Sequence, residues 1–205
     1  DLVYLSAEND QVKLDQIPQA QSSLISFNPK TGEVLSYVGG SVFNDSQFDR
    51  VRQSYPQSGS VFKPFIYASA FSGGYNPSSL INDAPIIFED ENLETFWRPE
   101  NYSGKFYGLT TLREALVQSI NIVSIKLLRE IGIKKSSETV DNFGFGIERL
   151  PQDLSLALGS GNFSPAEVAR GFSVFANGGM ISDIHYVSQI KDCLLYTSPS
   201  PRDKS

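Results

Sequence analysis

The chain has 205 residues, of which 40% are hydrophobic and 20% are charged, and its formal net charge is −6. These proportions are those of an ordinary globular protein with one sizeable hydrophobic core. The negative charge and the lack of a basic cluster argue against a nucleic-acid-binding protein. No apolar run is long enough to span a bilayer, and the first residues do not resemble a signal peptide. If the protein acts outside the cytoplasm, we expect its targeting segment upstream.

The scarcity of cysteine and histidine restricts the chemistry. Cys193 is the single cysteine, so neither an internal disulfide nor a cysteine-based metal site can form. A Ser-His-Asp triad could use only His185, and a zinc site of the usual kind would lack ligands. We therefore expect no metal and no cofactor, and a surface or strand position for His185. In a serine enzyme of this composition, lysine is the expected base.

The N-terminal third is predicted to be strands and loops. Residues 1–19 predict a short strand and a polar connection, the end of an upstream linker or of a small β module. Residues 21–27 and 33–38 predict a β-hairpin, because the residues between them have turn composition. That turn contains Lys30-Thr31-Gly32, which we interpret as turn chemistry only, exposed and distant from any active site. Residues 41–57 predict a loop.

Ser60 and Lys63 lie three residues apart at the predicted start of a helix that runs to about Phe71. Pro64 has no N–H, which places this segment in the first turn of the helix. Side chains at positions i and i+3 share one face, so the hydroxyl and the amine can meet. The pair alone also fits a helix cap beside a solvated lysine. The neighbouring apolar side chains predict burial instead; they are Phe62, Phe65, Ile66 and Ala70.

Such a pair has a possible chemical use. Serine is a poor nucleophile unless a base lies next to it. Lysine can be that base only if burial or nearby positive charge lowers its pKa. The N-terminus of a helix adds the positive potential that favours an alkoxide-like oxygen and a neutral amine.

The middle of the chain predicts an irregular region followed by two helices. Residues 76–110 are mostly irregular and include an exposed acidic stretch at 89–94. Thr111 and Glu114 form a capping-box pattern that opens a helix to about Gln118. Ser119-Ile120-Asn121 interrupts it, and a second helix is predicted over 122–130. Alone, this interruption also fits a polar break or a cap.

The last part predicts two further helices and a tail of different character. A short helix is predicted over 137–143, and the apolar, then glycine-rich run 154–161 predicts close backbone packing. Ser164-Pro165-Ala166-Glu167 is a capping-box pattern that opens a helix to about Asn177. Residues 192–205 resemble a translated sequencing adaptor, so we exclude them from fold reasoning.

With Ser60-Val61-Phe62-Lys63 and Ser119-Ile120-Asn121 in this order, residues 20–191 resemble the transpeptidase domain of bifunctional class A penicillin-binding proteins. The flanking motifs that carry the resemblance are Phe48-Asp49-Arg50, Trp97-Arg98-Pro99-Glu100-Asn101-Tyr102, Gly104-Lys105-Phe106-Tyr107-Gly108, Leu112-Arg113-Glu114-Ala115-Leu116 and Leu154-Ser155-Leu156-Ala157-Leu158-Gly159-Ser160-Gly161. The implied fold class is α/β, with helices packed on an antiparallel sheet, as in DD-peptidases and serine β-lactamases. We expect the Ser60 helix to be largely buried and the two motifs to meet at one cleft.

The resemblance also implies a role for each motif residue. Ser60 attacks the carbonyl between the two terminal D-alanines of a peptidoglycan stem peptide, and Lys63 accepts its proton. Ser119 relays a proton to the leaving amine, and Asn121 binds the substrate backbone and Lys63. The amine of a neighbouring stem peptide then takes the acyl group and forms a cross-link. β-Lactams acylate Ser60 because their strained amide imitates the bond between the D-alanines.

The implied partners are peptidoglycan stem peptides, the lipid-linked precursor polymer and β-lactam antibiotics. The implied location is the periplasm, or the extracytoplasmic face of the bacterial inner membrane. A membrane anchor and a glycosyltransferase domain are expected upstream.

One family motif does not fit. The third motif, Lys-Thr-Gly or Lys-Ser-Gly, is expected on a central strand beyond residue 191, whereas Lys30-Thr31-Gly32 lies far upstream. We therefore expect the domain 20–191 to be incomplete at its C-terminus. One missing oxyanion donor lowers a rate on the order of 10²–10³-fold, so the chain as given is expected to be nearly inactive.

Two alternatives remain open at this point. A D-Ala-D-Ala carboxypeptidase or β-lactamase-like serine hydrolase has the same fold, because the acceptor, amine or water, is not written in these motifs. A non-catalytic penicillin-binding sensor domain is acylated without turnover. Deacylation rates distinguish the sensor from the enzymes.

Overall fold

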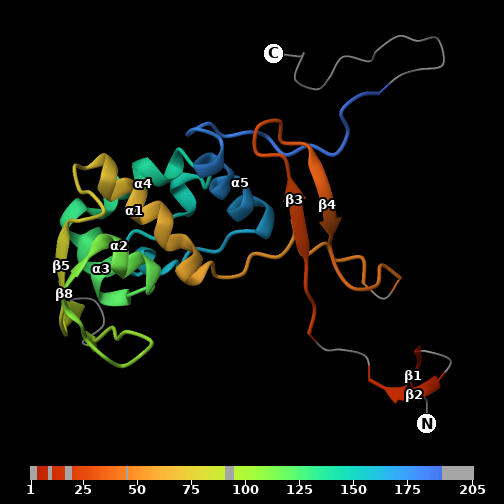
Figure 1. Ribbon diagram of the computed structural model, residues 1–205, viewed down its shortest axis with the longest axis horizontal. Helices are drawn as coiled ribbons and strands as arrows, with labels where there is room; N and C mark the ends of the chain where they lie inside the picture. The colour runs from red at the N-terminus through yellow and green to blue at the C-terminus, as the bar shows by residue number, and fades with distance from the viewer. Residues whose placement is uncertain (1–3, 9–10, 17–19, 45, 91–94, 191–205) are drawn as a thin grey trace.

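The computed structural model describes residues 4–8, 11–16, 20–44, 46–90 and 95–190. The helices gather in one body, the β3–β4 hairpin lies beside α5, and the β1–β2 hairpin lies apart from both (Figure 1). The expected α/β class is confirmed. The predicted tail 192–205 lies outside the described residues.

The strands form four antiparallel pairs rather than one sheet in the described part of the chain. The pairs are β1 (Tyr4–Glu8) with β2 (Gln11–Asp15), β3 (Leu24–Phe27) with β4 (Val34–Val38), β5 (Leu80–Asp83) with β8 (Gly108–Thr111), and β6 (Phe88–Asp90) with β7 (Thr95–Trp97). The antiparallel sheet on which the helices were expected to pack is thus represented here by small pairs, of which β3–β4 contacts α5.

The predicted hairpin at 21–27 and 33–38 is confirmed as β3–β4. Its turn closes through the N–H of Gly32, which donates to the carbonyl of Asn28 at 2.8 Å. The Asn28 side chain accepts from the N–H of Lys30 at 2.9 Å, as in an Asx turn. Lys30 and Thr31 are exposed, and the turn lies at the end of the hairpin away from α1 (Figure 1). The turn interpretation of Lys30-Thr31-Gly32 is confirmed, but the expected exposure holds only for Lys30 and Thr31, because Gly32 is buried.

His185 lies in a strand-like position, as expected. It forms an isolated parallel bridge with Glu33. Its N–H donates to the Gly32 carbonyl at 2.9 Å, and its carbonyl accepts from the N–H of Val34 at 3.1 Å.

Two strand predictions were incomplete. Residues 1–19 contain a hairpin rather than one strand, with Leu5 opposite Leu14. The region 76–110 was predicted to be mostly irregular, but it contains β5–β8 and β6–β7. In the β5–β8 pair, Ile81 lies opposite Thr110. The two strands are too far apart in the sequence to be joined by a short turn, so no turn pattern could predict their pairing.

The predicted helices are present. The 3₁₀ turn η1 (Gly59–Phe62) continues into α1 (Lys63–Ser72). The others are α2 (Leu112–Val117), α3 (Asn121–Ile131), α4 (Ile133–Asp141) and α5 (Pro165–Ala176), with the 3₁₀ turns η2 (Ile147–Arg149) and η3 (Leu154–Leu158). Helix α4 begins at Ile133 rather than at 137, because one residue, Gly132 with φ 90°, is enough to separate it from α3.

Both predicted capping boxes mark helix starts. Ser164 and Glu167 bond reciprocally at the start of α5, which is the complete form of the motif. At α2, the Thr111 side chain accepts from the N–H of Glu114 at 3.2 Å. The caps explain why these two boundaries were predictable.

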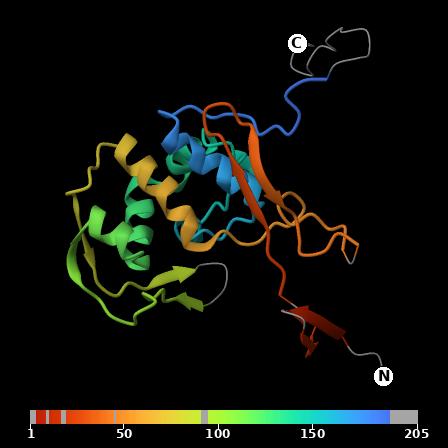
Figure 2. The ribbon, with the colours of Figure 1, turned by 45° about the vertical axis from the view of Figure 1, so that its right-hand side comes forward.

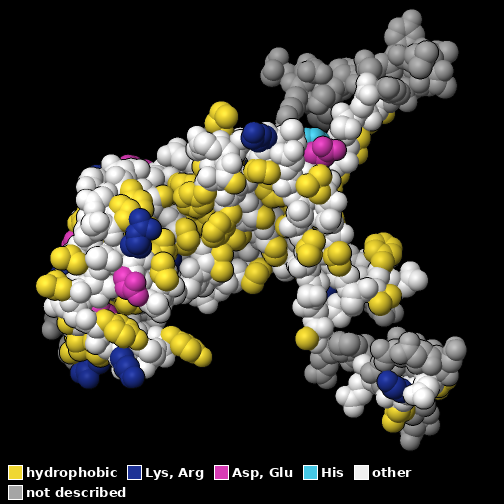
Figure 3. All heavy atoms as spheres, in the orientation of Figure 1, with side chains coloured by type: hydrophobic (Ala, Val, Ile, Leu, Met, Phe, Trp, Pro, Cys, Tyr) yellow, Lys and Arg dark blue, Asp and Glu magenta, His cyan; other side chains and the backbone are white. Residues whose placement is uncertain are grey.

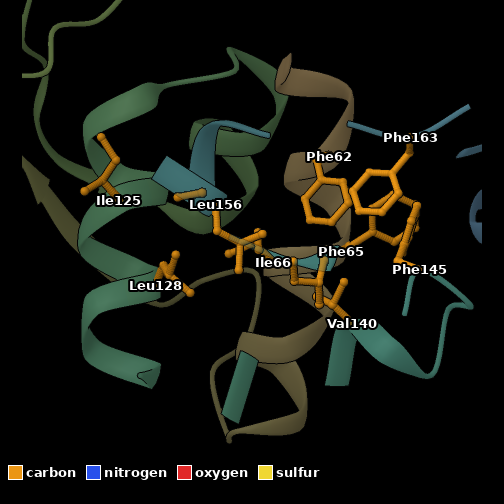
Figure 4. Packing of buried hydrophobic residues seen from close by; sticks show 11 residues of the cluster. Phe62, Phe65, Ile66, Ile125, Leu128, Val140, Phe145, Leu156 and Phe163 are labelled. Atoms are coloured by element: carbon orange, nitrogen blue, oxygen red, sulfur yellow. The ribbon is translucent and has the colours of Figure 1, made fainter. Parts of the chain in front are cut away.

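Helix α1 lies in the middle of the core. Its Phe65 and Ile66 side chains, with Phe62 of the preceding η1 turn, point into a cluster that also contains Phe145 and Phe163 (Figure 4). The Phe62 and Phe163 rings stack at 5.7 Å between centroids, and Phe65 and Phe145 meet edge to face at 4.8 Å. On its other side, Tyr67 and Ala70 belong to a second buried cluster. The predicted burial of this helix is confirmed.

Helix α5 connects the helical body to the β3–β4 hairpin. It lies between α1 and β3 in the turned view (Figure 2). Phe172 of α5 meets Phe65 of α1 edge to face at 5.0 Å. Apolar side chains gather over these two helices next to β3 on the face shown in Figure 3. Within the described ranges, no helix is both long and apolar enough to cross a bilayer.

Candidate active site

Ser60 lies in the exposed 3₁₀ turn that precedes α1. Its carbonyl accepts from the N–H of Lys63, so the two residues share one turn. Its side chain is exposed, and its hydroxyl has no hydrogen-bond partner among the described residues. The hydroxyl is therefore free to meet a molecule from solvent.

The glycine-rich segment 159–161 packs against this turn and accepts two hydrogen bonds from its backbone. The N–H of Gly59 donates to the Gly159 carbonyl at 2.9 Å, and the N–H of Ser58 donates to the Gly161 carbonyl at 3.1 Å. Gly159 has φ 73°, and a Cβ at that position would lie 1.9 Å from the Gly59 carbonyl oxygen. The close backbone packing predicted for 154–161 is confirmed, and its partner is the turn that carries Ser60.

Lys63 is buried, with 1% of its surface exposed. Its Nζ donates to the Ser119 carbonyl at 2.6 Å, to Ser119 Oγ at 3.1 Å and to Asn121 Oδ1 at 2.7 Å. All of these acceptors are uncharged. Burial lowers the pKa of Lys63 from 10.5 to about 8, because the charged ammonium loses water.

Ser119 has an unusual backbone conformation. Its φ is 53°, and it is the one non-glycine residue with positive φ in the described part of the chain. Such a backbone is strained for a residue with a Cβ. It lets both the carbonyl and the hydroxyl of Ser119 reach Lys63 Nζ. The predicted interruption between two helices is confirmed, because α2 ends at Val117 and α3 begins at Asn121.

Asn121 is the first residue of α3, and its amide is held at both ends. Oδ1 accepts from Lys63, and Nδ2 donates to the Glu100 carbonyl at 2.9 Å. Its backbone N–H donates to the Asn101 side chain at 3.0 Å. The amide of Asn121 therefore has a defined orientation toward Lys63.

Three of the four predicted residues are in direct contact. Lys63 joins Ser119 and Asn121 through hydrogen bonds, and Ser60 stands on the same turn as Lys63. A cavity of about 670 Å³ is lined mainly by residues 107–114, with Gln118 and Ile120 on either side of Ser119, and none of the four predicted residues lines it. In the described ranges, no group of three or more histidine, cysteine, aspartate or glutamate side chains could hold a metal ion.

Sequence reasoning missed two residues behind the site. Asn101 donates from Nδ2 to both carboxylate oxygens of Asp83, at 2.9 Å and 2.9 Å. The only signal for Asn101 was its place in the flanking motif 97–102, and Asp83 had none. Both are buried, with 6% and 1% of their surfaces exposed.

Comparisons with known proteins identify the family of this chain. The family model described as the penicillin binding protein transpeptidase domain matches residues 23–205. Penicillin-binding protein 1A of Pseudomonas aeruginosa is 44% identical over 198 residues, which are 95% of this chain and 24% of that protein. The crystal structure of penicillin-binding protein 1A from Haemophilus influenzae has a TM-score of 0.89 at 35% identity, over 96% of this chain and 29% of that chain.

A more distant structure shares the fold alone. Penicillin-binding protein A from Mycobacterium tuberculosis, solved as a penicillin G acyl-enzyme complex, has a TM-score of 0.73 at 19% identity. That match covers 88% of this chain and 51% of the other. Against its bacterial 1A relative from P. aeruginosa, the chain spans about a quarter of the length, 24%. The chain belongs to the penicillin-binding protein transpeptidase family, as a transpeptidase-domain segment homologous to the class A penicillin-binding protein 1A.

Proposed function

We propose that this chain carries the acylating half of a peptidoglycan D,D-transpeptidase that also binds penicillin covalently. The observation that carries the proposal is a buried lysine with only uncharged acceptors, on the same turn as a serine whose hydroxyl has no partner among the described residues. A pKa of about 8 leaves about a tenth of Lys63 neutral at pH 7. A lysine with the ordinary pKa would be neutral in fewer than about one molecule in a thousand.

The proposed first step forms the acyl-enzyme. Ser60 Oγ attacks the carbonyl between the two D-alanines of the donor stem peptide, and its proton passes to neutral Lys63. The tetrahedral intermediate collapses by breaking the C–N bond. The leaving D-alanine amine takes up the proton from Lys63 through the Ser119 hydroxyl, which already bonds to Nζ.

The proposed second step forms the cross-link. The amine of a neighbouring stem peptide attacks the Ser60 ester and gives its proton to Lys63, and the Ser60 oxygen leaves and regains a proton. Asn121 binds the substrate backbone and keeps Lys63 in place, as its contact with Nζ supports. The whole protein is proposed to act on the lipid-linked precursor polymer at the extracytoplasmic face of the membrane, with a glycosyltransferase domain and an anchor upstream of this segment.

Penicillin labelling tests the proposed nucleophile. The protein to use is P. aeruginosa penicillin-binding protein 1A in which residues 23–190 of this chain replace the matching segment, called the chimera below. We expect one covalent adduct per molecule, mapped by peptide mass spectrometry to Ser60, and none in Ser60→Ala. Ser72→Ala removes an exposed hydroxyl at the other end of α1 and is expected to label normally. An adduct on Ser119 or Ser160, or full labelling of Ser60→Ala, would overturn the assignment.

Product analysis tests the acceptor. The chimera is incubated with a stem pentapeptide donor and a D-amino acid acceptor. A transpeptidase gives the exchanged peptide, whereas a carboxypeptidase gives only the shortened acid. A sensor domain gives neither and retains the penicillin adduct.

A further inference from the structure

We propose that Asp83 and Asn101 are positioning residues that hold Asn121, and through it Lys63, in the geometry for acylation; this rests on the proposed function. The Asn101 side chain makes five hydrogen bonds. Nδ2 donates to Asp83 Oδ1, Asp83 Oδ2 and the Lys105 carbonyl, each at 2.9 Å. Oδ1 accepts from the backbone N–H groups of Asn121 at 3.0 Å and Ile122 at 3.1 Å.

Asn101 replaces the missing cap of α3. The first N–H groups of a helix have no partner within the helix. At α3 the N-cap residue is Ile120, whose side chain cannot accept a hydrogen bond. The buried Oδ1 of Asn101 accepts from the first two N–H groups instead. The residue before it, Glu100, accepts from Asn121 Nδ2. Two adjacent residues thus fix both the backbone and the side chain of Asn121, leaving its Oδ1 for Lys63.

Asp83 determines which way the Asn101 amide faces. A carboxylate only accepts, so it requires the amide nitrogen on its side and sends the amide oxygen toward α3. Asp83 also accepts from the N–H of Tyr107 at 2.9 Å, which ties the end of β5 to the segment before β8. The chain of contacts runs from Asp83 through Asn101 and Asn121 to Lys63. If the Asn101 amide is turned the wrong way, Asn121 shifts, and Lys63 shifts with it.

The test reverses the polarity of the pair in the chimera. Asn101→Asp sets two carboxylates face to face and is expected to slow acylation by penicillin about 10²-fold, since small misplacements of reacting groups cost about that much. The double variant Asp83→Asn/Asn101→Asp restores one donor and one acceptor. Residue 101 can still accept from Asn121 and Ile122, and residue 83 can still accept from Tyr107. The Lys105 carbonyl has no donor from residue 101 in the double variant, so we expect the acylation rate to recover in part and to exceed that of either single variant.

The readout separates positioning from folding. The acylation constant k2 is measured apart from the noncovalent constant K, per molecule of folded protein. Asn101→Asp is expected to lower k2 steeply and to weaken K much less, because Asn121, which is proposed to bind the substrate backbone, is shifted rather than removed. Asn142→Asp, a change of the same kind at an exposed position that caps the end of α4, is the matched control and is expected to acylate normally.

The results distinguish a failure of the positioning role from a failure of the proposed function. If Asn101→Asp lowers the yield of folded protein, Asp83→Asn alone is used instead. It removes the charge and turns one acceptor oxygen into a donor, and its k2 is compared with that of the double variant. Normal k2 in the single variants, or a double variant no faster than the slower single one, would overturn the positioning role while the proposed function stands. An unmutated chimera that is not acylated at Ser60 would overturn the proposed function and this inference with it.

Discussion

Lys63 is buried, and the acceptors around its amine are two oxygens of Ser119 and one of Asn121, all uncharged. These neutral acceptors satisfy the amine without stabilising its charge as a carboxylate would. Desolvation then decides the protonation state and brings the pKa to about 8. The contacts that allow the lysine to be buried therefore also suit the role of base proposed for it.

The pH dependence of acylation follows from this pKa. Since Lys63 must be neutral to take the Ser60 proton, we expect the acylation rate to rise about tenfold per pH unit below pH 8 and to level off above it. Stopped-flow acylation of the chimera between pH 6 and 9.5 measures this. A rate that is flat over that range, or falls as pH rises, would contradict the assignment of Lys63 as base.

The lowered pKa of Lys63 makes the stability of the fold increase with pH, as it does the expected acylation rate. The folded-state pKa, about 8, lies below the ordinary value of 10.5, so between these values the unfolded chain holds the extra proton. Stability therefore rises with pH across this window, and the cost of burying the ammonium is fully present below it. Lys63 is thus not expected to cause unfolding at alkaline pH, where acylation is fastest.

The site was predictable only in part. Ser60, Lys63, Ser119 and Asn121 follow from two short motifs, because the residues of each motif lie close together in the sequence. The burial of Lys63 followed from its aromatic neighbours. The Asp83–Asn101 pair joins the end of β5 to a residue 18 positions further along the chain, and a buried polar contact of this kind leaves no periodic pattern in the sequence.

At the scale of the element, the turn that carries Ser60 is held by hydrogen bonds to the backbone of residues 159–161. The η1 turn bonds to the segment after η3 through Gly59 and Gly159, with no side chain between them. Ser60, the proposed nucleophile, is therefore positioned by backbone contacts of its turn rather than by a contact of its own side chain. Glycine is required at 159 for two reasons, its positive φ and the lack of space for a Cβ.

Gly159→Ala tests this dependence. We expect it to slow acylation of the chimera markedly and to destabilise the fold, because the Cβ would lie 1.9 Å from the Gly59 carbonyl oxygen and the turn must move. Gly178→Ala is the matched control, since Gly178 has φ 61° and nothing within 4 Å of the added Cβ. Gly178→Ala is therefore expected to lower the free energy of unfolding only by the cost of a positive φ in alanine, about 1–2 kcal/mol. Equal acylation rates in the two variants would contradict the role of the glycine contact.

At the scale of the whole molecule, an aromatic cluster joins elements from distant parts of the chain. Phe145 has its ring centroid 5.0 Å from that of Phe62, and 4.8 Å from those of Phe65 and Phe163. It thereby connects α1 with the segments that follow α4 and η3. The position of the active-site helix depends on this cluster.

Phe145→Ala is expected to destabilise the domain by about 3–5 kcal/mol, because it leaves a cavity among rings that cannot collapse onto it. Phe43→Ala, at a side chain that is 71% exposed, is the control and is expected to change stability by less than about 0.5 kcal/mol. Retention of penicillin labelling in increasing denaturant measures both variants. A Phe145→Ala midpoint equal to that of Phe43→Ala would contradict the cluster's structural role.

Elements held by contacts between residues close in the sequence were predictable, and those held by contacts between distant residues were not. The β3–β4 hairpin and helices α2 and α5 have turn and cap residues within a few positions, and they were predicted. The strands β5 and β8 pair across the whole 84–107 region, and the pairing was missed. Sequence patterns report local geometry, whereas the partner of a distant strand is decided by packing.

The backbone of Ser119 has a consequence for any attempt to engineer this domain. A left-handed residue with a side chain is held there at a cost of about 1–2 kcal/mol, and glycine would relieve it. A library selected only for heat resistance will therefore enrich Ser119→Gly. That change keeps the carbonyl that bonds to Lys63 but deletes the hydroxyl proposed to carry the proton. Selection for thermal stability therefore favours glycine at position 119, whereas selection for the proposed transpeptidase activity favours serine.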